Sequence, residues 1–390
     1  MSYAPCNLYE RTQDHMFTLE ALEAKEGDCL ILHYGPADAP KRILIDGGPS
    51  GVFKQTLRKR LVQLREEGSA DLQMVMVSHI DADHIAGILD FFKELKKQRD
   101  DGEEPLARVA TLWFNSFDDV VGNDSDELIA RFETAAQTAA AGDRVSADSP
   151  VSQAGALILA GVGQGRKLRD LASALGTVVN AGFDNMILAS VSGDAPRRIK
   201  LDDHLTFTVL GPTKTQLVEL REKWDQELAK IKSSSPARAS AIAAAFLDTS
   251  AANLSSTVVL AECEGKRMLL TGDARGDFIL EGLNEANLLE NGGIHVDLMK
   301  VPHHGSDRNV STEFFRQVTA DHYVISANGK HHNPDKAMLE MLRQARQGES
   351  YTVHFTNEVE QVSEYVERGA AEGYNTVVRA ENELGLAIVL

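Results

Sequence analysis

The chain has 390 residues, of which 43% are hydrophobic and 25% charged, a balance typical of globular proteins that bury a core. Its formal net charge is −18 at pH 7, which argues against a general binder of duplex nucleic acid because the phosphates would be repelled. Three widely spaced cysteines without a CxxC pair argue against a disulfide framework and against a thiolate zinc site.

The first third of the chain predicts short strands, turns and two helices. The segments "CLILHYG" (29–35) and "RILIDGG" (42–48) are apolar, bounded by Gly and Pro, and predict a hairpin. Leucines at helical spacing predict a helix over 52–67. The run "MVMVS" (74–78) predicts a buried strand, and 85–99 predicts a second helix.

The middle of the chain predicts helical insertions, at about 124–200 and 213–250, within one domain that spans 1–390. The glycine-rich "GVGQGRK" (161–167) lacks the order of a phosphate-binding loop and is interpreted as a flexible loop before a helix. The "TKTQ" at 213–216 predicts a capping box. Further strands are expected over 206–212, 256–265, 267–273, 295–302 and 322–328, and in "YTVHF", "NTVVRA" and "LGLAIVL". Strands with helices between and after them predict a layered α/β fold.

The segment "SHIDADHIAG" brings four cation-binding side chains together directly after a predicted strand: His79, Asp81, Asp83 and His84. Two carboxylates this close repel each other, and a divalent cation removes that cost. The alternative is an ordinary strand-to-helix turn with an Asp cap and surface histidines. That alternative explains a single residue well and all four together poorly.

Other acidic and imidazole side chains also follow predicted strands. Asp273 ends "LLTGD", His303 and His304 follow the next strand, and His331 and His332 follow the one after. A layered fold can bring such loops together at one edge, so the sequence predicts a metal site there. Five other histidines have no ligand-rich neighbourhood in the sequence and are assigned structural roles: His15, His33, His295, His322 and His354.

Five motifs in order, "ILIDGGPSG", "SHIDADHIAG", "LLTGDA", "VPHHGS" and "HHNP", resemble those of the metallo-β-lactamase superfamily. The chain is most similar to the branch that contains the hydrolase-like domain of ComEC proteins. The resemblance implies a four-layer αββα sandwich with helical insertions. It also implies a centre of one or two divalent ions, Zn²⁺ or Mn²⁺, and hydrolysis by metal-activated hydroxide.

The resemblance also implies a role for each motif residue. Asp46 supports the metal loop, His79 and Asp81 bind the first ion, Asp83 and His84 bind the second, and Asp273 bridges the ions. His303 is the first choice for the remaining ligand; His304 orients it, contacts substrate or is itself the ligand. The superfamily usually has a histidine where Asp81 stands, and another where this chain has Asn253 and Ser256, which are assigned supporting roles. His204, well upstream, is not expected to substitute. The oxygen-rich donor set shifts the preference from Zn²⁺ towards Mn²⁺ or Mg²⁺.

The resemblance to the ComEC branch, together with the oxygen-rich donor set, implies a metal-dependent hydrolase with a phosphodiester substrate, nucleic acid included, which makes the chain a candidate nuclease. Asp83, His304 and His332 are the expected catalytic residues, and the expected substrate-binding residues are Lys300, Ser306, Lys330 and His331, with Arg308 beside them. Ordinary surface chemistry explains the basic residues equally well. The alternatives are a lactone or thioester hydrolase and a non-catalytic binding protein with a degenerate site.

The sequence shows no signal peptide or membrane span, so a cytoplasmic protein is expected. The insertions are expected to hold a protein partner or a second copy.

Overall fold

The computed structural model describes residues 15–121, 150–189, 195–232 and 255–390. Among these residues, the strands form two sheets, one of seven strands and one of eight. The expected helix at 124–142, the continuation of the second insertion beyond 232, and Asn253 lie outside the described residues. No helix of the described part is long and apolar enough to cross a membrane.

The first sheet is built mainly from the N-terminal half of the chain and has the order β15-β1-β2-β3-β4-β5-β6. The hairpin expected around residue 40 is present as an antiparallel pair, and β3, β4, β5 and β6 run parallel. Its strands are β1 (His15–Leu22), β2 (Leu30–Pro36), β3 (Lys41–Ile45), β4 (Met74–Met76), β5 (Thr111–Trp113), β6 (Val178–Val179) and β15 (Gly385–Val389).

The second sheet is built from the C-terminal half and has the order β14-β13-β12-β11-β10-β9-β8-β7. Strands β10 to β14 are parallel, whereas β7, β8, β9 and β10 alternate in direction. Its strands are β7 (Arg198–Lys200), β8 (Thr206–Gly211), β9 (Val258–Cys263), β10 (Lys266–Leu270), β11 (Ile294–Lys300), β12 (Val318–Ile325), β13 (Thr352–Phe355) and β14 (Asn375–Val378).

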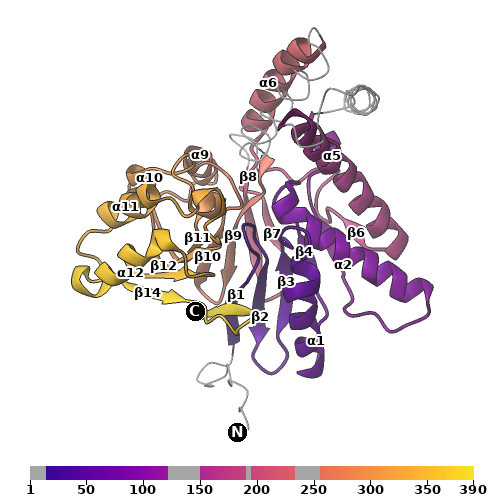
Figure 1. Cartoon of the computed structure of the whole chain (residues 1–390), viewed down its shortest axis with the longest axis horizontal. Coiled ribbons are helices and arrows are strands. Elements are labelled where there is room, and N and C mark those ends of the chain that lie inside the picture. The colour runs from indigo at the N-terminus through magenta and orange to yellow at the C-terminus, as the bar shows by residue number, and fades with distance from the viewer. Residues whose placement is uncertain (1–14, 122–149, 190–194, 233–254) are drawn as a thin grey trace.

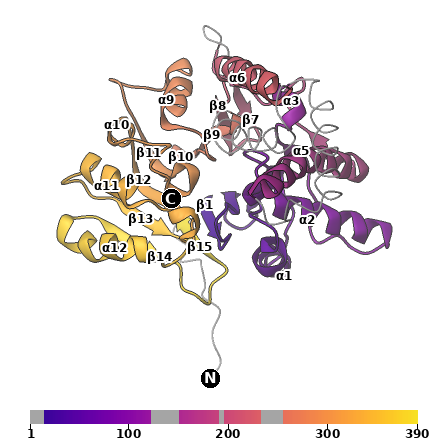
Figure 2. The same ribbon diagram turned by 45° about the horizontal axis from the view of Figure 1, so that its top comes forward.

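Helices cover the outer face of each sheet (Figures 1 and 2). The first sheet carries η1 (Phe53–Leu57), α1 (Arg58–Glu66), α2 (Ala82–Asp100) and α5 (Pro150–Leu175), with α3 (Phe117–Val121) and α6 (Lys214–Lys232) beyond them. The second sheet carries α9 (Gly276–Glu285), α10 (Thr312–Gln317), α11 (Lys336–Ala345) and α12 (Glu360–Glu372). Two short turns, η3 (Pro302–Gly305) and η4 (Lys330–His332), complete the elements.

Three buried apolar layers separate these elements, and they define the architecture. One lies between the first sheet and its helices and includes Val75 and Phe91. A second lies between the second sheet and its helices and includes Phe314. The third lies between the two sheets, where Met74 of one sheet and Phe207 of the other are both buried. The expected four-layer αββα sandwich is therefore confirmed.

Two local predictions can be compared with the structure. The capping box at the start of α6 is confirmed, because Thr213 N donates to Gln216 Oε1 at 3.0 Å and Gln216 N donates to Thr213 Oγ1 at 3.2 Å. The interpretation of residues 161–167 as a loop is wrong, because they lie within the continuous helix α5. The three glycines of this segment lower helix propensity, but packing on a neighbouring helix can override that preference, as α5 packs on α2. Whether 1–390 forms one domain stays a prediction.

Candidate metal centre

The first half of the centre lies where β4 ends. Asp46, directly after β3, has a left-handed backbone (φ 57°) that turns its carboxylate towards this point. There Asp46 Oδ1 accepts from Ser78 N at 2.8 Å, and Asp46 Oδ2 accepts from Ser78 Oγ at 2.7 Å. A buried carboxylate thus fixes the residue that precedes His79, in the position expected of a supporting residue.

Helix α2 begins inside the motif, and two glycines let it approach the Asp46 loop closely. Gly47 N donates to His84 O, and Gly87 N donates to Gly48 O. A Cβ at Gly87 would stand 1.8 Å from Gly47 O, so the helix could not approach this closely with any other residue there. This contact orients the first turn of α2, which carries Asp83 and His84 into the centre.

The second half comes from the other sheet. Asp273 follows β10 through Gly272, whose backbone is left-handed (φ 50°) and where a Cβ would meet Ser78 Cβ at 2.9 Å. Thr257 N donates to Ser78 O at 2.8 Å, which joins the start of β9 to the end of the first sheet. The two sheets therefore meet backbone to backbone directly beside Asp273.

His303 and His304 both point into the centre because the chain after β11 bends sharply. Both have left-handed backbones, with φ 48° and 53°, and Gly305 continues the bend with φ 83°. Non-glycine residues adopt this region at a cost, and such strained turns concentrate at functional sites. The two rings lie nearly perpendicular, at 85°, so adjacent residues reach different parts of the cluster.

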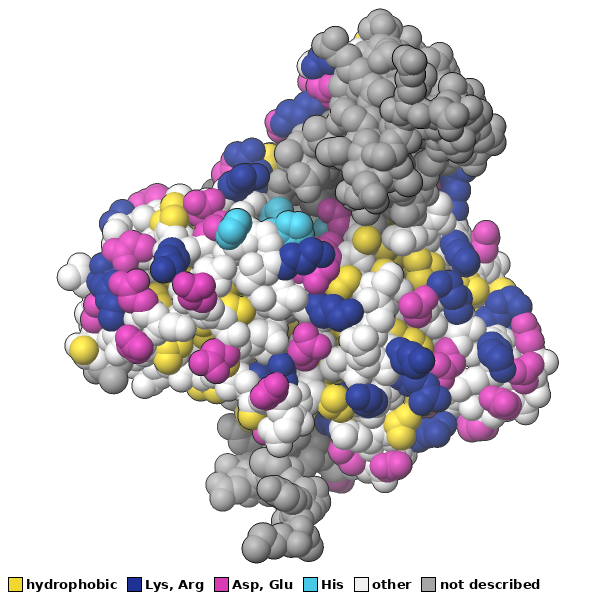
Figure 3. Space-filling view, in the orientation of Figure 1, with side chains coloured by type: hydrophobic (Ala, Val, Ile, Leu, Met, Phe, Trp, Pro, Cys, Tyr) yellow, Lys and Arg dark blue, Asp and Glu magenta, His cyan; other side chains and the backbone are white. Residues whose placement is uncertain are grey.

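The ring and carboxylate atoms converge around buried Asp273. His79 Nε2, His303 Nε2 and His304 Nε2 lie 3.7, 3.7 and 3.6 Å from Asp273 Oδ2, and His84 Nε2 lies 3.4 Å from Asp273 Oδ1. Asp81 Oδ2 lies 3.6 Å from His79 Nε2, and Asp83 Oδ2 lies 3.5 Å from His304 Nε2. Seven predicted residues, from both sheets, are thus brought together. Figure 3 shows histidine side chains reaching the upper part of the molecular surface.

All four histidines are held by their other nitrogen. His84 Nδ1 donates to Asp46 Oδ2 at 2.8 Å and His303 Nδ1 to Asn309 Oδ1 at 2.9 Å. His304 Nδ1 donates to Ser326 O at 3.1 Å, and His79 Nδ1 lies 3.0 Å from Ser78 Oγ and 3.3 Å from Ser256 Oγ. With Nδ1 as donor, each neutral ring presents the lone pair of Nε2 to the cluster, the arrangement found in metal-binding histidines.

The cluster fits a cation on two further grounds. His79 Nε2 and Asp273 Oδ1 are buried and make no hydrogen bond with any described residue, which is costly unless an ion satisfies them. His84 Nε2 and His304 Nε2 lie 3.3 Å apart, so two lone pairs would face each other. A divalent cation would remove both penalties.

The pKa values of the buried histidines also indicate that the cluster favours a cation. Burial opposes a charged imidazole, yet the carboxylates of Asp273 and Asp46 raise the pKa of His84 well above its usual value. Burial also opposes the charged form of His304. The carboxylates of Asp273 and Asp28 outweigh that effect and raise the pKa of His304 to about 10. Without a cation, the carboxylates thus draw protons onto the rings. The cluster therefore has a deficit of positive charge that a metal ion would fill.

Asp28 is a residue that the sequence analysis missed. Its carboxylate is 1% exposed, and Lys300 Nζ, also 1% exposed, lies 2.7 Å from Asp28 Oδ2. Atoms of Asp28, His84, Asp273 and His304 lie within 4.8 Å of one another. However, Asp28 Oδ1 is 3.4 Å from His304 Nδ1, on the side of the ring that faces away from the cluster. Asp28 therefore orients His304, and Asp83 is the carboxylate on the Nε2 side.

The predicted role of Lys300 requires a correction. Lys300 was expected to hold a substrate phosphate, but its ammonium is buried, paired with Asp28, and donates to Val301 O at 3.1 Å. A side chain so enclosed cannot reach a substrate. His304, expected among the catalytic residues, has both ring nitrogens engaged within the cluster and fits a ligand position rather than that of a free acid.

The other predicted residues lie around the centre. Ser256 Oγ accepts from Asp273 N at 3.2 Å, and Ser306 is buried with its Oγ accepting from Arg308 N at 3.4 Å. His331 and His332 are exposed on the neighbouring loop, and Lys330 Nζ lies 2.5 Å from Glu26 Oε1. The roles assigned to individual residues stay predictions.

No family model matches the chain. The chain is 35% identical to ComE operon protein 3 of Bacillus subtilis (strain 168) over 99 residues. The matched segment covers 25% of this chain and 12% of that protein's length. The match therefore spans a small part of that relative.

Solved structures similar to the chain share little sequence with it. They include the metallo-β-lactamase fold protein YhfI of Bacillus subtilis, at 10% identity, TM-score 0.36 and coverage of 96% of this chain and 99% of that one. Zn²⁺-bound PqqB of Methylobacterium extorquens has 9% identity, TM-score 0.41 and coverage of 96% and 100%. A diphosphatase from the PhnP family has 11% identity, TM-score 0.36 and coverage of 95% and 96%.

Two sheets between helical layers, with the histidine and aspartate loops of both sheets at one edge, decide the fold. The chain has the metallo-β-lactamase fold. The partial match to ComE operon protein 3 is consistent with the ComEC-type branch expected from the motifs.

Proposed function

We propose that the chain is a metal-dependent hydrolase and that phosphodiesters are its substrates. One observation carries the proposal: four histidines, each fixed through Nδ1, direct Nε2 to a buried cluster of aspartates formed by loops of both sheets. Prearranged neutral imidazoles and carboxylates are the donor set of divalent metal centres that perform hydrolysis.

The donors can be assigned to two groups that share Asp273. His79, Asp81 and His303 form one group, in which His79 and His303 are both 3.7 Å from Asp273 Oδ2. His304 Nε2 lies 3.6 Å from the same oxygen and is assigned to the second group by its shorter distances to His84 and Asp83. His303 would thus supply the imidazole that the superfamily usually takes from the region around Ser256.

The second group consists of Asp83, His84 and His304, with separations between 3.3 and 4.0 Å. In this proposal both adjacent histidines, His303 and His304, would be ligands, each in a different group.

Substrate would approach from the side of the cluster that remains open. The side chains of Asp81, Asp83 and His303 are 34%, 31% and 28% exposed, whereas those of His79 and His84 are at most 1% exposed. A bound divalent ion would supply a Lewis acid that polarises the scissile group and makes water nucleophilic near neutral pH. The chain's own contribution is to hold the donors rigid and to exclude water from the buried side.

A proton donor for the leaving oxygen would come from the neighbouring loop. Asp335 N donates to Gly305 O at 2.9 Å, and Asp307 N donates to Asp335 Oδ2 at 3.0 Å, so this loop packs directly on the bend that carries His304. His332 is exposed on it and suits the role of general acid, with His331 beside it for substrate contact. The oxygen donors of the cluster favour Mn²⁺ or Mg²⁺. Phosphodiesters suit such ions, because a bound ion would stabilise the charge that builds on the phosphoryl oxygens.

A second candidate, hydrolysis of an uncharged lactone or thioester, has one observation in its favour. Lys300 and Lys330, both expected to bind phosphate, are each paired with a carboxylate, of Asp28 and Glu26 respectively. A site whose nearby lysines are neutralised offers less attraction to a charged phosphodiester than the sequence indicates.

Metal-stripped protein reloaded with Mn²⁺ or Zn²⁺ separates the candidates. Hydrolysis of bis(p-nitrophenyl) phosphate is expected, with loss of at least 1000-fold in Asp273→Asn, because removing a shared carboxylate weakens both groups. Asp321→Asn is the matched control, because this exposed aspartate lies within β12 and faces His295 near the start of β11 rather than the cluster. Cleavage of a thioester or lactone alone would replace the phosphodiester proposal, and no metal uptake with no hydrolysis would favour a non-catalytic binding protein.

A further inference from the structure

We propose a second metal site, for Zn²⁺, formed by His15, His204 and Glu264 at the edge of the sandwich opposite the candidate metal centre. In the described part of the chain these three side chains offer ligand atoms within 4.8 Å of one another. His15 Nδ1 lies 3.9 Å and His204 Nδ1 3.7 Å from Glu264 Oε1, and the two rings are 5.5 Å apart.

The strand directions place this cluster away from the first one. β1 is antiparallel to β2, β2 is antiparallel to β3, and β3 is parallel to β4, so His15 at the start of β1 lies opposite the end of β4. Glu264 lies in the turn that precedes β10, whereas Asp273 follows the end of that strand. An ion here would have no contact with the reacting atoms at the other edge.

Two of the three side chains, those of His204 and Glu264, are carried by well-anchored segments. The loop that holds His204 is fixed by Asp202, whose Oδ1 accepts from His204 N at 2.8 Å. Asp202 Oδ2 in turn accepts from Lys41 Nζ at 2.7 Å and from Tyr34 Oη at 3.1 Å, both in the first sheet. Glu264 occupies the tight turn between β9 and β10. Rigid supporting segments of this kind lower the entropic cost of closing side chains onto an ion.

The donor chemistry favours zinc. The distances of 3.7 and 3.9 Å are too long for hydrogen bonds, so the carboxylate faces two ring nitrogens without bonding to either. Two imidazoles and one carboxylate are a common Zn²⁺ donor set, with bonds of about 2.0–2.2 Å, and leave a fourth position for water. Donors on a tetrahedral ion with such bonds lie about 3.4 Å apart. A small rotation of the side chains, which are 43% exposed for His15, 24% for His204 and 52% for Glu264, would bring the three donors to that spacing.

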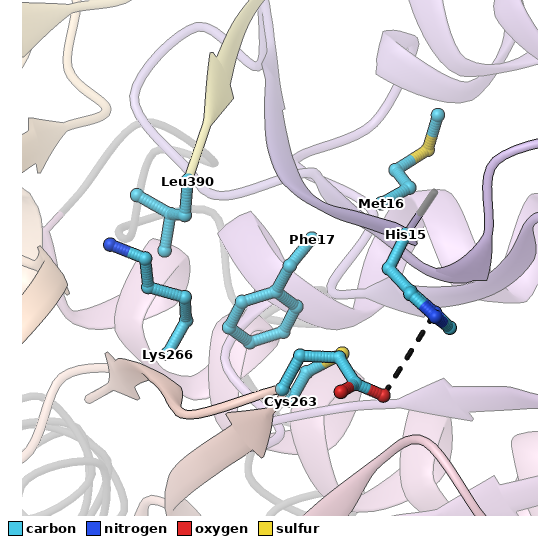
Figure 4. Close-up of a pocket in the computed structure, with 7 residues that line it drawn as sticks. His15, Met16, Phe17, Cys263, Lys266 and Leu390 are labelled. Carbon is cyan, nitrogen blue, oxygen red and sulfur yellow. Dashed lines mark ion pairs between the residues drawn. The ribbon is translucent and has the colours of Figure 1, made fainter. Parts of the chain in front are cut away.

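A pocket of about 310 Å³ opens beside the cluster, and its wall includes Phe17, Cys263 and Leu390 (Figure 4). Figure 4 shows His15 among the residues that line the pocket, and the dashed line marks the ion pair of His15 with Glu264. The pocket gives solvent access to the fourth position. Because His15 belongs to the first sheet and the other two ligands to the second, the ion would join the two sheets at this edge.

The test counts zinc ions per chain in the full-length protein by equilibrium dialysis against micromolar free Zn²⁺ and elemental analysis. Wild-type protein is expected to hold one more ion than His204→Gln or Glu264→Gln, with Zn²⁺ affinity at this site reduced at least tenfold by either change. Asp273→Asn should retain the additional ion, which separates this site from the first. Anomalous diffraction at the zinc edge should place a peak between His15 and His204.

The matched control is His295→Gln, because His295 is also about half exposed and lies 3.5 Å from one carboxylate, that of Asp321, without a second histidine. It should bind as much zinc as wild type. Equal zinc content in wild type, His204→Gln and Glu264→Gln would overturn the proposal, as would a zinc peak absent from this edge. Melting curves of all variants in chelator verify that each one folds.

Discussion

Replacing Lys300 with Met distinguishes a buried structural lysine from a substrate ligand. Met keeps most of the aliphatic stem and removes the ammonium, so Asp28 loses its partner. The Nζ–Oδ2 distance is 2.7 Å, both side chains are 1% exposed, and Asp28 Oδ1 makes no hydrogen bond with a described residue. Removing one member of such a pair typically costs about 3–5 kcal/mol of stability, because a charge is left buried.

The expected loss for Lys300→Met is therefore about 3–5 kcal/mol at pH 7. Burial alone would raise the pKa of Asp28, but Lys300 holds it far below its usual value. A depressed folded pKa stabilises the protein above the unfolded pKa of 3.8 and loses that contribution as pH falls. Without Lys300 the carboxyl can accept a proton more easily, so the penalty of the substitution should shrink between pH 7 and about pH 4.

Guanidinium unfolding in chelator, followed by circular dichroism, measures the free energies for wild type, both single variants and Asp28→Asn/Lys300→Met. The double variant should be more stable than Lys300→Met by about 2 kcal/mol or more, because no charge remains unpaired. A loss below about 1 kcal/mol for Lys300→Met, together with a raised KM, would refute the reasoning and restore Lys300 as a substrate ligand.

Three further predictions concern the centre and its support. Asp273→Asn should remove the ions of the candidate metal centre, so that elemental analysis finds at most the one ion proposed for His15, His204 and Glu264, whereas unchanged content would place the ions of the centre elsewhere. The raised pKa of His304, about 10 in metal-free protein, means that binding displaces a proton. The apparent affinity for Mn²⁺ should therefore increase roughly tenfold per pH unit between pH 6.5 and 9 for each proton released, and a pH-independent affinity would contradict this. The same group stabilises metal-free protein below pH 6.5, and that contribution should disappear as pH rises through about 10. Gly87→Ala should cost about 3 kcal/mol or more, because its Cβ would stand 1.8 Å from Gly47 O. Gly102→Ala, with φ 71° and open space around the new Cβ, should cost only about 1 kcal/mol in the same unfolding assay.

The fold and the members of the cluster could be predicted because their signals are local. His79, Asp81, Asp83 and His84 are nearly consecutive and follow an apolar run, and Asp273 also follows a strand. Residues that follow strands are brought to one edge by a layered fold, so their convergence follows from the strand pattern. The predicted hairpin and capping box likewise depend on neighbouring residues alone.

Other features depend on partners far apart in sequence. Nothing around Lys300 indicates that it pairs with Asp28, and nothing around His15 indicates His204 and Glu264. A lysine beside a histidine motif has the same local pattern whether it points to solvent or into the core.

Helix α5 illustrates a different difficulty. Its glycines, within 161–167, lower helix propensity, but packing against α2 overrides that preference. Strand β1 was also missed: its centre, FTLEA, alternates apolar and polar residues, but few turn residues bound it.

The pairing of β15 with β1 has a consequence for how the polypeptide acquires its shape during translation. The first sheet is otherwise complete by residue 179, yet β1 gains its outer neighbour only from residues 385–389. Until the ribosome has released that last strand, the nascent N-terminal half carries a bare hydrogen-bonding edge, which other chains can join. Any shortened version ending before residue 385 would retain this exposure permanently, so aggregation of such fragments would say little about the chemistry of the centre.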